Sequence, residues 1–225
     1  MIRKWLATTG VLLAAGAWLF AQGAQRPMSP DGSAQTQVLG KWVKGERPAF
    51  SLGRENYEGG KWIEITYGRP LQRGRDLFGS GENYGKAVND VGTATFPAPP
   101  VWRAGANVTT RLKTEAALNF GGKAVGPGEY SLFVDLKSPA EWTLIVSNWP
   151  AQQKFNPQDR NALWGAYGYT PDKDVARIPM KVETMPFAVD QLTWTFVDMT
   201  SDGGRLALMW GKTLASAAFK ATASR

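Results

Sequence analysis

The stretch that decides the fold is residues 118–146, which read LNFGGKAVGPGEYSLFVDLKSPAEWTLIV. Apolar residues occupy every second position in its longer segments, as at Leu132, Val134 and Leu136. A period of two is typical of a strand with one buried face. Gly-Gly, Gly-Pro-Gly and Ser-Pro-Ala separate the segments and favour turns. The stretch therefore predicts a meander of short antiparallel strands.

The same alternation recurs on both sides of this stretch. It covers residues 61–67, 108–112, 175–182, 191–197, 206–210 and 214–219. Pro179 restricts its segment to a sheet edge or a bulge, because proline has no amide hydrogen for the ladder. No helical pattern is long enough for a crossover between parallel strands. We expect an all-β domain over residues 41–225, an antiparallel β-sandwich or jelly-roll-like fold, preceded by an N-terminal signal or anchor helix.

The N-terminus has the features of a secretory signal. Arg3 and Lys4 precede an uncharged stretch at residues 5–21, and Ala21-Gln22-Gly23 offers small residues where a signal peptidase cuts. We expect a signal peptide at residues 1–23, a flexible linker at 24–40, and an extracytoplasmic domain, periplasmic or secreted. The alternative is a membrane anchor at residues 5–21, a length at the lower limit of a bilayer span. Membrane contact is expected only through this segment.

The composition excludes most familiar active sites. The chain has no histidine and no cysteine, which removes Ser-His-Asp and Cys-His catalysis, disulfides, and the usual zinc, copper, haem and iron–sulfur ligands. We therefore expect no cofactor and no metal site. The ten Trp, ten Phe and six Tyr predict an aromatic core. The net charge of +7 comes from scattered Lys and Arg, a pattern that favours solubility over nucleic-acid binding.

One long segment, residues 68–107, lacks strand periodicity and is rich in Gly, Pro, Arg and Asn. Loops of this length are usually functional or disordered. Phe78, Tyr84, Phe96 and Trp102 could hold this one in place. We predict an ordered loop that packs over one mouth of the sandwich.

Several motifs carry a resemblance to a known family. They are YGRP at residues 67–70, RGRDLFG at 73–79, WRAGAN at 102–107 and GKAVGPGEYSLF at 122–133. Together they resemble the bacterial DUF2911 group of exported proteins, over roughly residues 49–219. The resemblance implies an all-β extracytoplasmic domain, and it implies no activity and no catalytic residue. The long stretch at residues 80–100 departs from the family pattern.

Four arginines, at positions 69, 73, 75 and 103, lie in or beside the long loop. A guanidinium group suits bidentate contact with a carboxylate, phosphate or sulfate, so these residues could form an anion cradle. The alternative is that each pairs with an internal carboxylate such as Asp76, Asp135 or Asp174, because a partly buried arginine needs such a partner.

Two further groups of residues have a functional and a structural interpretation. Asn107 ends Gly105-Ala106-Asn107, where a backbone could approach a ligand, but Asn in a left-handed turn explains the same residues. Trp164 is followed by Tyr167 and Tyr169, and the three could form a stacking platform for sugar rings or peptide side chains. Burial of these rings is the alternative.

These observations predict a non-catalytic module that binds a small anionic or sugar-like ligand at a mouth built from residues 68–107 and 164–177. The predicted contact residues are Arg75, Arg103, Asn107, Trp164 and Arg177, and the predicted supporting residues are Arg69 and Asp174. One alternative is a hydrolase of cell-envelope polymers that uses a pair of carboxylates, since glycoside hydrolysis requires only two. Another is a structural envelope scaffold. The missing histidine and cysteine favour binding over catalysis.

Overall fold

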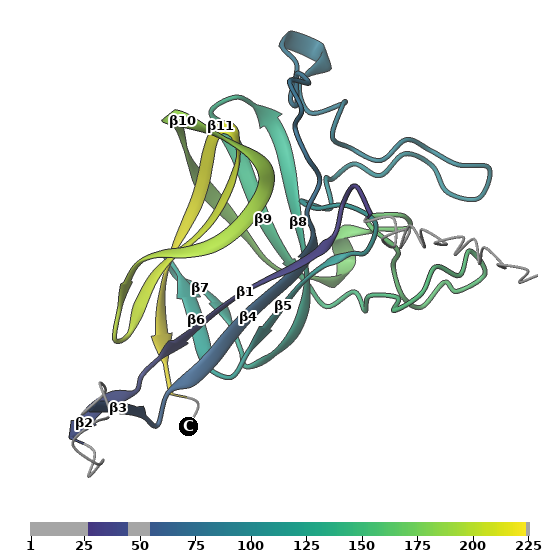
Figure 1. The fold of residues 1–225 in the computed structure, drawn as a ribbon. Coiled ribbons are helices and arrows are strands. Elements are labelled where there is room, and N and C mark those ends of the chain that lie inside the picture. Colours follow the sequence, from purple (N-terminus) through teal and green to yellow (C-terminus); the bar gives the residue numbers. More distant parts are fainter. Residues whose placement is uncertain (1–26, 45–54, 224–225) are drawn as a thin grey trace, which may run out of the picture.

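The computed structural model describes residues 27–44 and 55–223, and within them the chain is all-β. Nine strands form one antiparallel sheet in the order β1-β4-β5-β8-β9-β10-β11-β6-β7, and β2 pairs separately with β3 (Figure 1). The strands are β1 (Asp31–Val38), β2 (Lys41–Lys44), β3 (Glu55–Glu58), β4 (Lys61–Gly68), β5 (Thr110–Thr114), β6 (Ala117–Phe120), β7 (Lys123–Val125), β8 (Gly128–Ser138), β9 (Glu141–Ser147), β10 (Asp174–Thr200) and β11 (Gly203–Thr222). The prediction of an antiparallel all-β fold is confirmed.

The described residues hold two single 3₁₀ turns, η1 (Gly81–Asn83) and η2 (Pro171–Lys173), and no α-helix. No helix in this part of the chain is long and apolar enough to cross a membrane. The expected signal or anchor helix at residues 1–23 lies outside the described residues.

The hairpins β6–β7 and β8–β9 form where the sequence predicts them. The prediction of one continuous meander is wrong, because β7 lies at an edge of the sheet while β8 pairs with β5 and β9. Tight hairpin turns need a positive φ at their first central residue, whereas Pro127, between β7 and β8, holds φ at about −65°. The chain instead crosses to β5, which pairs with β8 from Gly128 to Leu132.

Two long strands, β10 and β11, replace the four short strands expected in the C-terminal part. The first part of β10 pairs with β9, and its register with β11 begins at Lys181. Pro179 therefore lies where β10 is paired with β9 alone, in agreement with its predicted edge position. Register shifts between Thr184 and Thr193 bend β10, so that the sheet curves around one core (Figure 1).

The core is aromatic, as the composition predicts. Trp102, Trp142, Trp194 and Trp210 are all buried within it. The rings of Trp102 and Trp210 stack with centroids 6.0 Å apart. A smaller cluster on the opposite face of β8 and β9 includes Phe133 and is covered by residues 163–169.

The long loop at residues 68–107 is anchored to the sheet at both of its ends. Leu77, Phe78 and Trp102 are buried, and Trp102 exchanges two backbone hydrogen bonds of 2.8 Å with Val134 of β8. The part around η1 projects from the sheet in Figure 1. The loop therefore contributes to the core, as its aromatic residues suggest.

The prediction of a flexible linker at residues 24–40 is wrong for Asp31–Val38, which form β1 and pair with β4 along their whole length. The sheet therefore begins before Lys41. The sequence concealed this strand because three of its inward positions carry Gly32, Ala34 and Thr36, and Val38 at its end is the one larger apolar residue among them. The side chain of Arg69 fills the space beside Gly32, where a Cβ atom would come within 2.1 Å of the arginine Cδ.

Candidate functional site

Arg103, a predicted contact residue, is held inside the protein. Its Nε donates to Asp90 Oδ2 at 3.0 Å, Nη2 bonds the other oxygen of Asp90, and Nη1 bonds the carbonyl of Asn107. Both charged side chains are only about a tenth exposed, at 10% for Arg103 and 11% for Asp90. Gly165 lies against the guanidinium group and leaves no room for a side chain. This arrangement is a structural clasp, and its carboxylate comes from the long loop.

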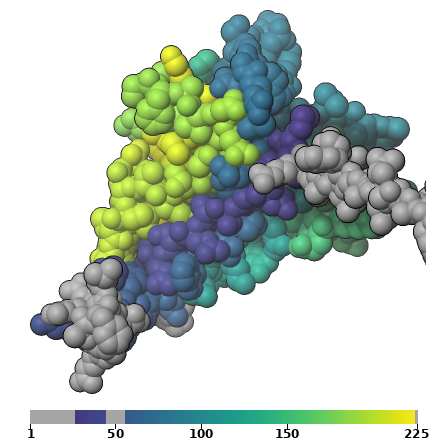
Figure 2. All heavy atoms as spheres, in the orientation of Figure 1, coloured from purple at the N-terminus to yellow at the C-terminus, as the bar shows by residue number. Residues whose placement is uncertain are grey.

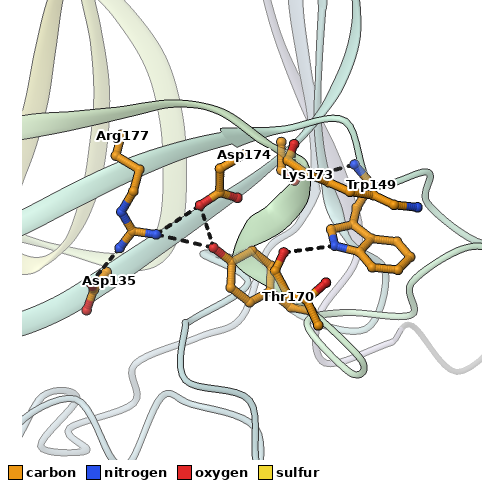
Figure 3. Close-up of polar contacts among 8 residues, drawn as sticks. Asp135, Trp149, Thr170, Lys173, Asp174 and Arg177 are labelled. Carbon is orange, nitrogen blue, oxygen red and sulfur yellow. Dashed lines mark hydrogen bonds and ion pairs between the residues drawn. The ribbon is translucent and has the colours of Figure 1, made fainter.

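Arg177 and Asp174 lie together in a second cluster (Figure 3). Arg177 donates to Asp174 Oδ2 at 2.9 Å and to Asp135 Oδ2 at 2.8 Å, whereas the sequence interpretation considered these carboxylates as partners of the four loop arginines. Tyr169 donates its hydroxyl to Asp174 at 2.7 Å. Burial raises the pKa of Tyr169, and the hydrogen bond to the Asp174 carboxylate raises it further. Tyr169 therefore stays a hydrogen-bond donor well into the alkaline range.

The same cluster fastens residues 148–173 to the sheet. Trp149 donates its indole N–H to the carbonyl of Thr170 at 3.0 Å, and the ammonium group of Lys173 lies 3.6 Å from the centre of the Trp149 ring (Figure 3). Ser147 donates its hydroxyl to the carbonyl of Lys173. One oxygen of Asp174 is buried without a hydrogen-bond partner among the described residues.

The side chains of the remaining predicted residues do not take part in these two clusters. Arg75 donates to the carbonyls of residues 71 and 72, and its guanidinium group lies 6.0 Å from the Trp210 ring. Asn107 has a φ of 60°, the left-handed conformation that the turn interpretation predicts. Trp164 is partly buried and packs against a neighbouring aromatic ring. Arg69 lies over β1.

A hollow of about 220 Å³ lies beside the long loop, but no residue of the predicted segment 164–177 lines it. It is lined by Pro70, Arg75, Asp76, Leu77, Ala87, Val88, Trp102, Gly105 and Trp210. Among the predicted contact residues, Arg75 alone lines it. The structure therefore brings Arg103 together with Asn107, and Arg177 together with Asp174, but it does not gather the predicted set around one cavity.

A larger hollow, of about 500 Å³, lies on the outer face of the sheet. It is lined by Asp31, Gly32, Ser33, Glu64, Thr66, Tyr67, Val108, Thr109, Arg111, Ala151, Gln152 and Gln153. Its floor is a row of directly paired residues in β1, β4 and β5, namely Ser33, Thr66 and Arg111. These side chains alternate with the core residues of the same strands and therefore point away from the core. β1 crosses the surface shown in Figure 2.

One wall of this hollow is held rigidly by Gln152. Its amide nitrogen donates to the carbonyls of Asn156, Asp159 and Ala162, and its amide oxygen accepts from the backbone N–H of Asn156. Gln152 is 8% exposed, so these bonds are shielded from competing water. The wall therefore keeps its shape, and its neighbour Gln153 presents an exposed amide beside the hollow.

Smaller hollows continue along the same face. Between them they share Glu64 and Arg111 with the first hollow. They add Gln35, Lys113 and Glu129, which together with Glu64 form a second row of directly paired residues. We call the whole feature the outer-face groove, and define it by these two rows together with residues 151–153. The charged residues of this groove are partly paired with each other, since Glu129 contacts both Arg111 and Lys113.

Sequence reasoning missed this groove although one signal for it was present. Glu64 and Thr66 alternate with buried Ile63 and Ile65, so a polar outer face of β4 was predictable. The neighbouring strand β1 was assigned to a linker, and the two polar rows could not be assembled without it. Among the described residues, no cluster of three or more carboxylate side chains is placed to hold a metal ion.

Comparison with known proteins gives one match. The family described as "Protein of unknown function (DUF2911)" matches residues 53–219, which include β3 to β10 and most of β11. No curated protein and no solved structure is significantly similar to this chain.

Proposed function

The chain belongs to the DUF2911 family, and because the description of that family states no activity, we propose a function from the geometry: an extracytoplasmic, non-catalytic β-sandwich module that binds a sugar-like ligand in the outer-face groove. The signal-like N-terminus supports the location. The observation that carries the proposal is a hollow of about 500 Å³ on an open sheet face, with several polar side chains in its lining and a volume within the range of small-molecule sites.

The side chains of the groove suit a ligand rich in hydroxyl groups. Ser33, Thr66 and Gln153 each offer both a donor and an acceptor, as a sugar hydroxyl does. No hydrogen bond within the described residues engages the hydroxyl groups of Ser33 and Thr66. Because Gln152 fixes the wall, binding costs little reorganisation of the protein.

The charge of the groove favours a neutral ligand over an anion. Its hollows are lined by four carboxylates, those of Asp31, Glu64, Glu115 and Glu129, and by two cations, Arg111 and Lys113. Both cations already contact Glu129. An anionic ligand would therefore meet excess negative charge, whereas a neutral polyol can donate to the carboxylates.

The second candidate is a carboxylate-dependent hydrolase. Glu64 of β4 and Glu129 of β8 lie directly opposite Lys113 of β5 in the strand register. Their backbones are therefore two strand spacings apart, about 10 Å by the usual distance between strands. That is close to the ~6.5–9.5 Å between the carboxyl groups of inverting glycosidases. Both oxygens of Glu129 face cations, Arg111 at Oε2 and Lys113 at Oε1. We favour binding because this engagement occupies a carboxylate that would have to activate water.

The proposal is tested by calorimetric titration of the purified chain with neutral mono- and disaccharides, with uronic acids and phosphates as anionic comparisons. Thr66→Arg places a long side chain on the floor of the groove and should weaken saccharide binding by at least about tenfold. Thr195→Arg, on β10 and outside the groove, is the matched control. Equal binding by the two variants would refute the groove as the site. Release of reducing ends by the wild type, abolished in Glu64→Gln and Glu129→Gln, would establish the hydrolase instead.

A further inference from the structure

The strands that floor the groove continue into a projecting ribbon. Val38 of β1 pairs with Lys61 of β4, and after a short irregularity Lys41 of β2 pairs with Glu58 of β3. β2 and β3 therefore extend the same antiparallel pair beyond the rest of the sheet, as Figure 1 shows. The outer-face groove is therefore continued by the surface of the β2–β3 ribbon, at the end of β1 and the beginning of β4.

The ribbon and the adjoining end of β4 carry tryptophan side chains that are unusually exposed. Trp42 is 68% exposed and Trp62 is 47% exposed. Tryptophan normally contributes to a core or an interface, because its ring buries a large apolar area. Trp42 packs edge-on against Tyr57, with ring centroids 5.2 Å apart, and the contact fixes its orientation without burying it.

Two close contacts show that the aromatic rings share one face of the ribbon. The Tyr57 ring lies across Gly40 and Gly60, where a Cβ atom would come within 2.3 and 2.9 Å of it, and the Tyr57 hydroxyl accepts a hydrogen bond from the Gly40 N–H at 2.9 Å. A Cβ at Gly60 would also meet the side chain of Gln37, which is paired with Trp62. Tyr57, Trp42 and Trp62 therefore form a row along the outer face.

The row runs directly into the groove. Trp62 lines a hollow of about 270 Å³ together with Gln35, Glu64, Lys113 and Glu115, and Glu64 also lines the main hollow. From Asp31 to Trp42 the track spans eleven residue steps, at most ~36 Å for an extended strand. The polar hollow and the aromatic row thus form one elongated surface, which we call the binding track.

We propose that the binding track holds a neutral glycan chain of several sugar units, with Trp62 and Trp42 stacking on separate rings of that chain. The inference rests on the proposed function and adds to it that the ligand is a polymer. A sugar ring has an apolar face of C–H groups and a rim of hydroxyls. The track matches both, because its two indole rings continue the line of amide and carboxylate acceptors in the groove.

The charges near the row favour a glycan over an anionic membrane. Lys41, Lys44 and Lys61 are exposed beside it, but Glu58 is exposed there too, and Glu64 and Glu115 line the adjoining hollow. These carboxylates offset the attraction of the lysines for a bilayer of anionic lipids. A flat bilayer also cannot follow the row into a walled groove.

The test is titration with two neutral series, β-linked glucose and β-linked N-acetylglucosamine oligomers, from disaccharide to hexasaccharide. In the wild type the affinity should rise with chain length. Trp42→Ala should lower hexasaccharide affinity by about three- to tenfold and leave disaccharide affinity unchanged, whereas Trp42→Phe should retain most of the gain. Phe187→Ala, which removes an aromatic ring 59% exposed on β10, is the matched control.

The outcomes separate this inference from the function on which it rests. Disaccharide binding that depends on Thr66, without any rise in affinity with length, would leave the proposed function standing and overturn the track. No saccharide binding at all would overturn both. Sedimentation with phosphatidylglycerol vesicles that is lost in Trp42→Ala, together with an unchanged hexasaccharide affinity in that variant, would assign the row to a membrane and overturn the track. Since Trp42 is exposed, its variants should melt with the wild type.

Discussion

Arg103 provides the sharpest test of the structure, because the clasp and a ligand site predict opposite results for one substitution. Arg103→Ala removes both contacts to Asp90 and the bond to the Asn107 carbonyl, and it leaves a carboxylate that is 11% exposed without its cation. Breaking a buried ion pair from one side costs about 3–5 kcal/mol. For a domain of this size, about 2–4 °C is lost per kcal/mol, so the melting temperature should fall by ~6–20 °C.

The measurement is thermal and urea unfolding of purified Arg103→Ala beside Arg75→Ala, whose exposed side chain bonds nearby backbone carbonyls and should cost less than about 1 kcal/mol. The double variant Arg103→Met/Asp90→Leu should regain much of the lost stability, because it removes the uncompensated charge. A melting temperature for Arg103→Ala within about 2 °C of the wild type would refute the clasp, since that shift is at most ~1 kcal/mol. Such a result would restore Arg103 as a candidate ligand contact.

Two further predictions concern the residues around the clasp and the second cluster. Tyr169→Phe removes the hydroxyl bonded to Asp174 and should cost about 1.5–3 kcal/mol at neutral pH. Because the folded-state pKa of Tyr169 is raised above the ordinary value of 10.0, this contribution is complete below pH 10 and is lost as the pH rises further. Urea titrations of wild type and variant from pH 8 to 11 should therefore converge, and a constant difference would contradict the assignment. Gly165→Ala should destabilise by at least about 1 kcal/mol more than Gly121→Ala, since both glycines have positive φ but a Cβ at Gly165 alone would meet Arg103.

The fold was predictable where local chemistry determines it. One face of β8 and of β9 carries large apolar residues at every second position, as at Leu132 and Val134, so the period is visible in the sequence although Phe133 is buried on the opposite face. β1 was not predictable in this way, because Gly32 and Ala34 face inward with little apolar area. The continuity of β10 through Pro186 was hidden as well, since the register shifts that accommodate this segment depend on its pairing with β11.

The features of the candidate site were likewise predictable only where neighbouring residues determine them. The left-handed turn at Asn107 follows from the residue itself and its neighbours, and it was among the sequence interpretations. The partner of Arg103 could not be predicted from the sequence, because Asp90 lies thirteen positions earlier in a loop without periodicity. The outer-face groove requires the pairing of β1 with β4 and β5, which is known only once the strands are placed.

The length of β10 and β11 has a consequence for how the chain acquires its structure. β9 pairs with β10, and β10 pairs with β11. β6 pairs with the last residues of β11, at Lys220–Thr222. A nascent polypeptide that ends before β11 would leave the inner sides of several earlier strands facing water. The cooperative unit therefore closes only after synthesis has passed Thr222, and truncations in this region should yield aggregation-prone fragments rather than smaller stable domains.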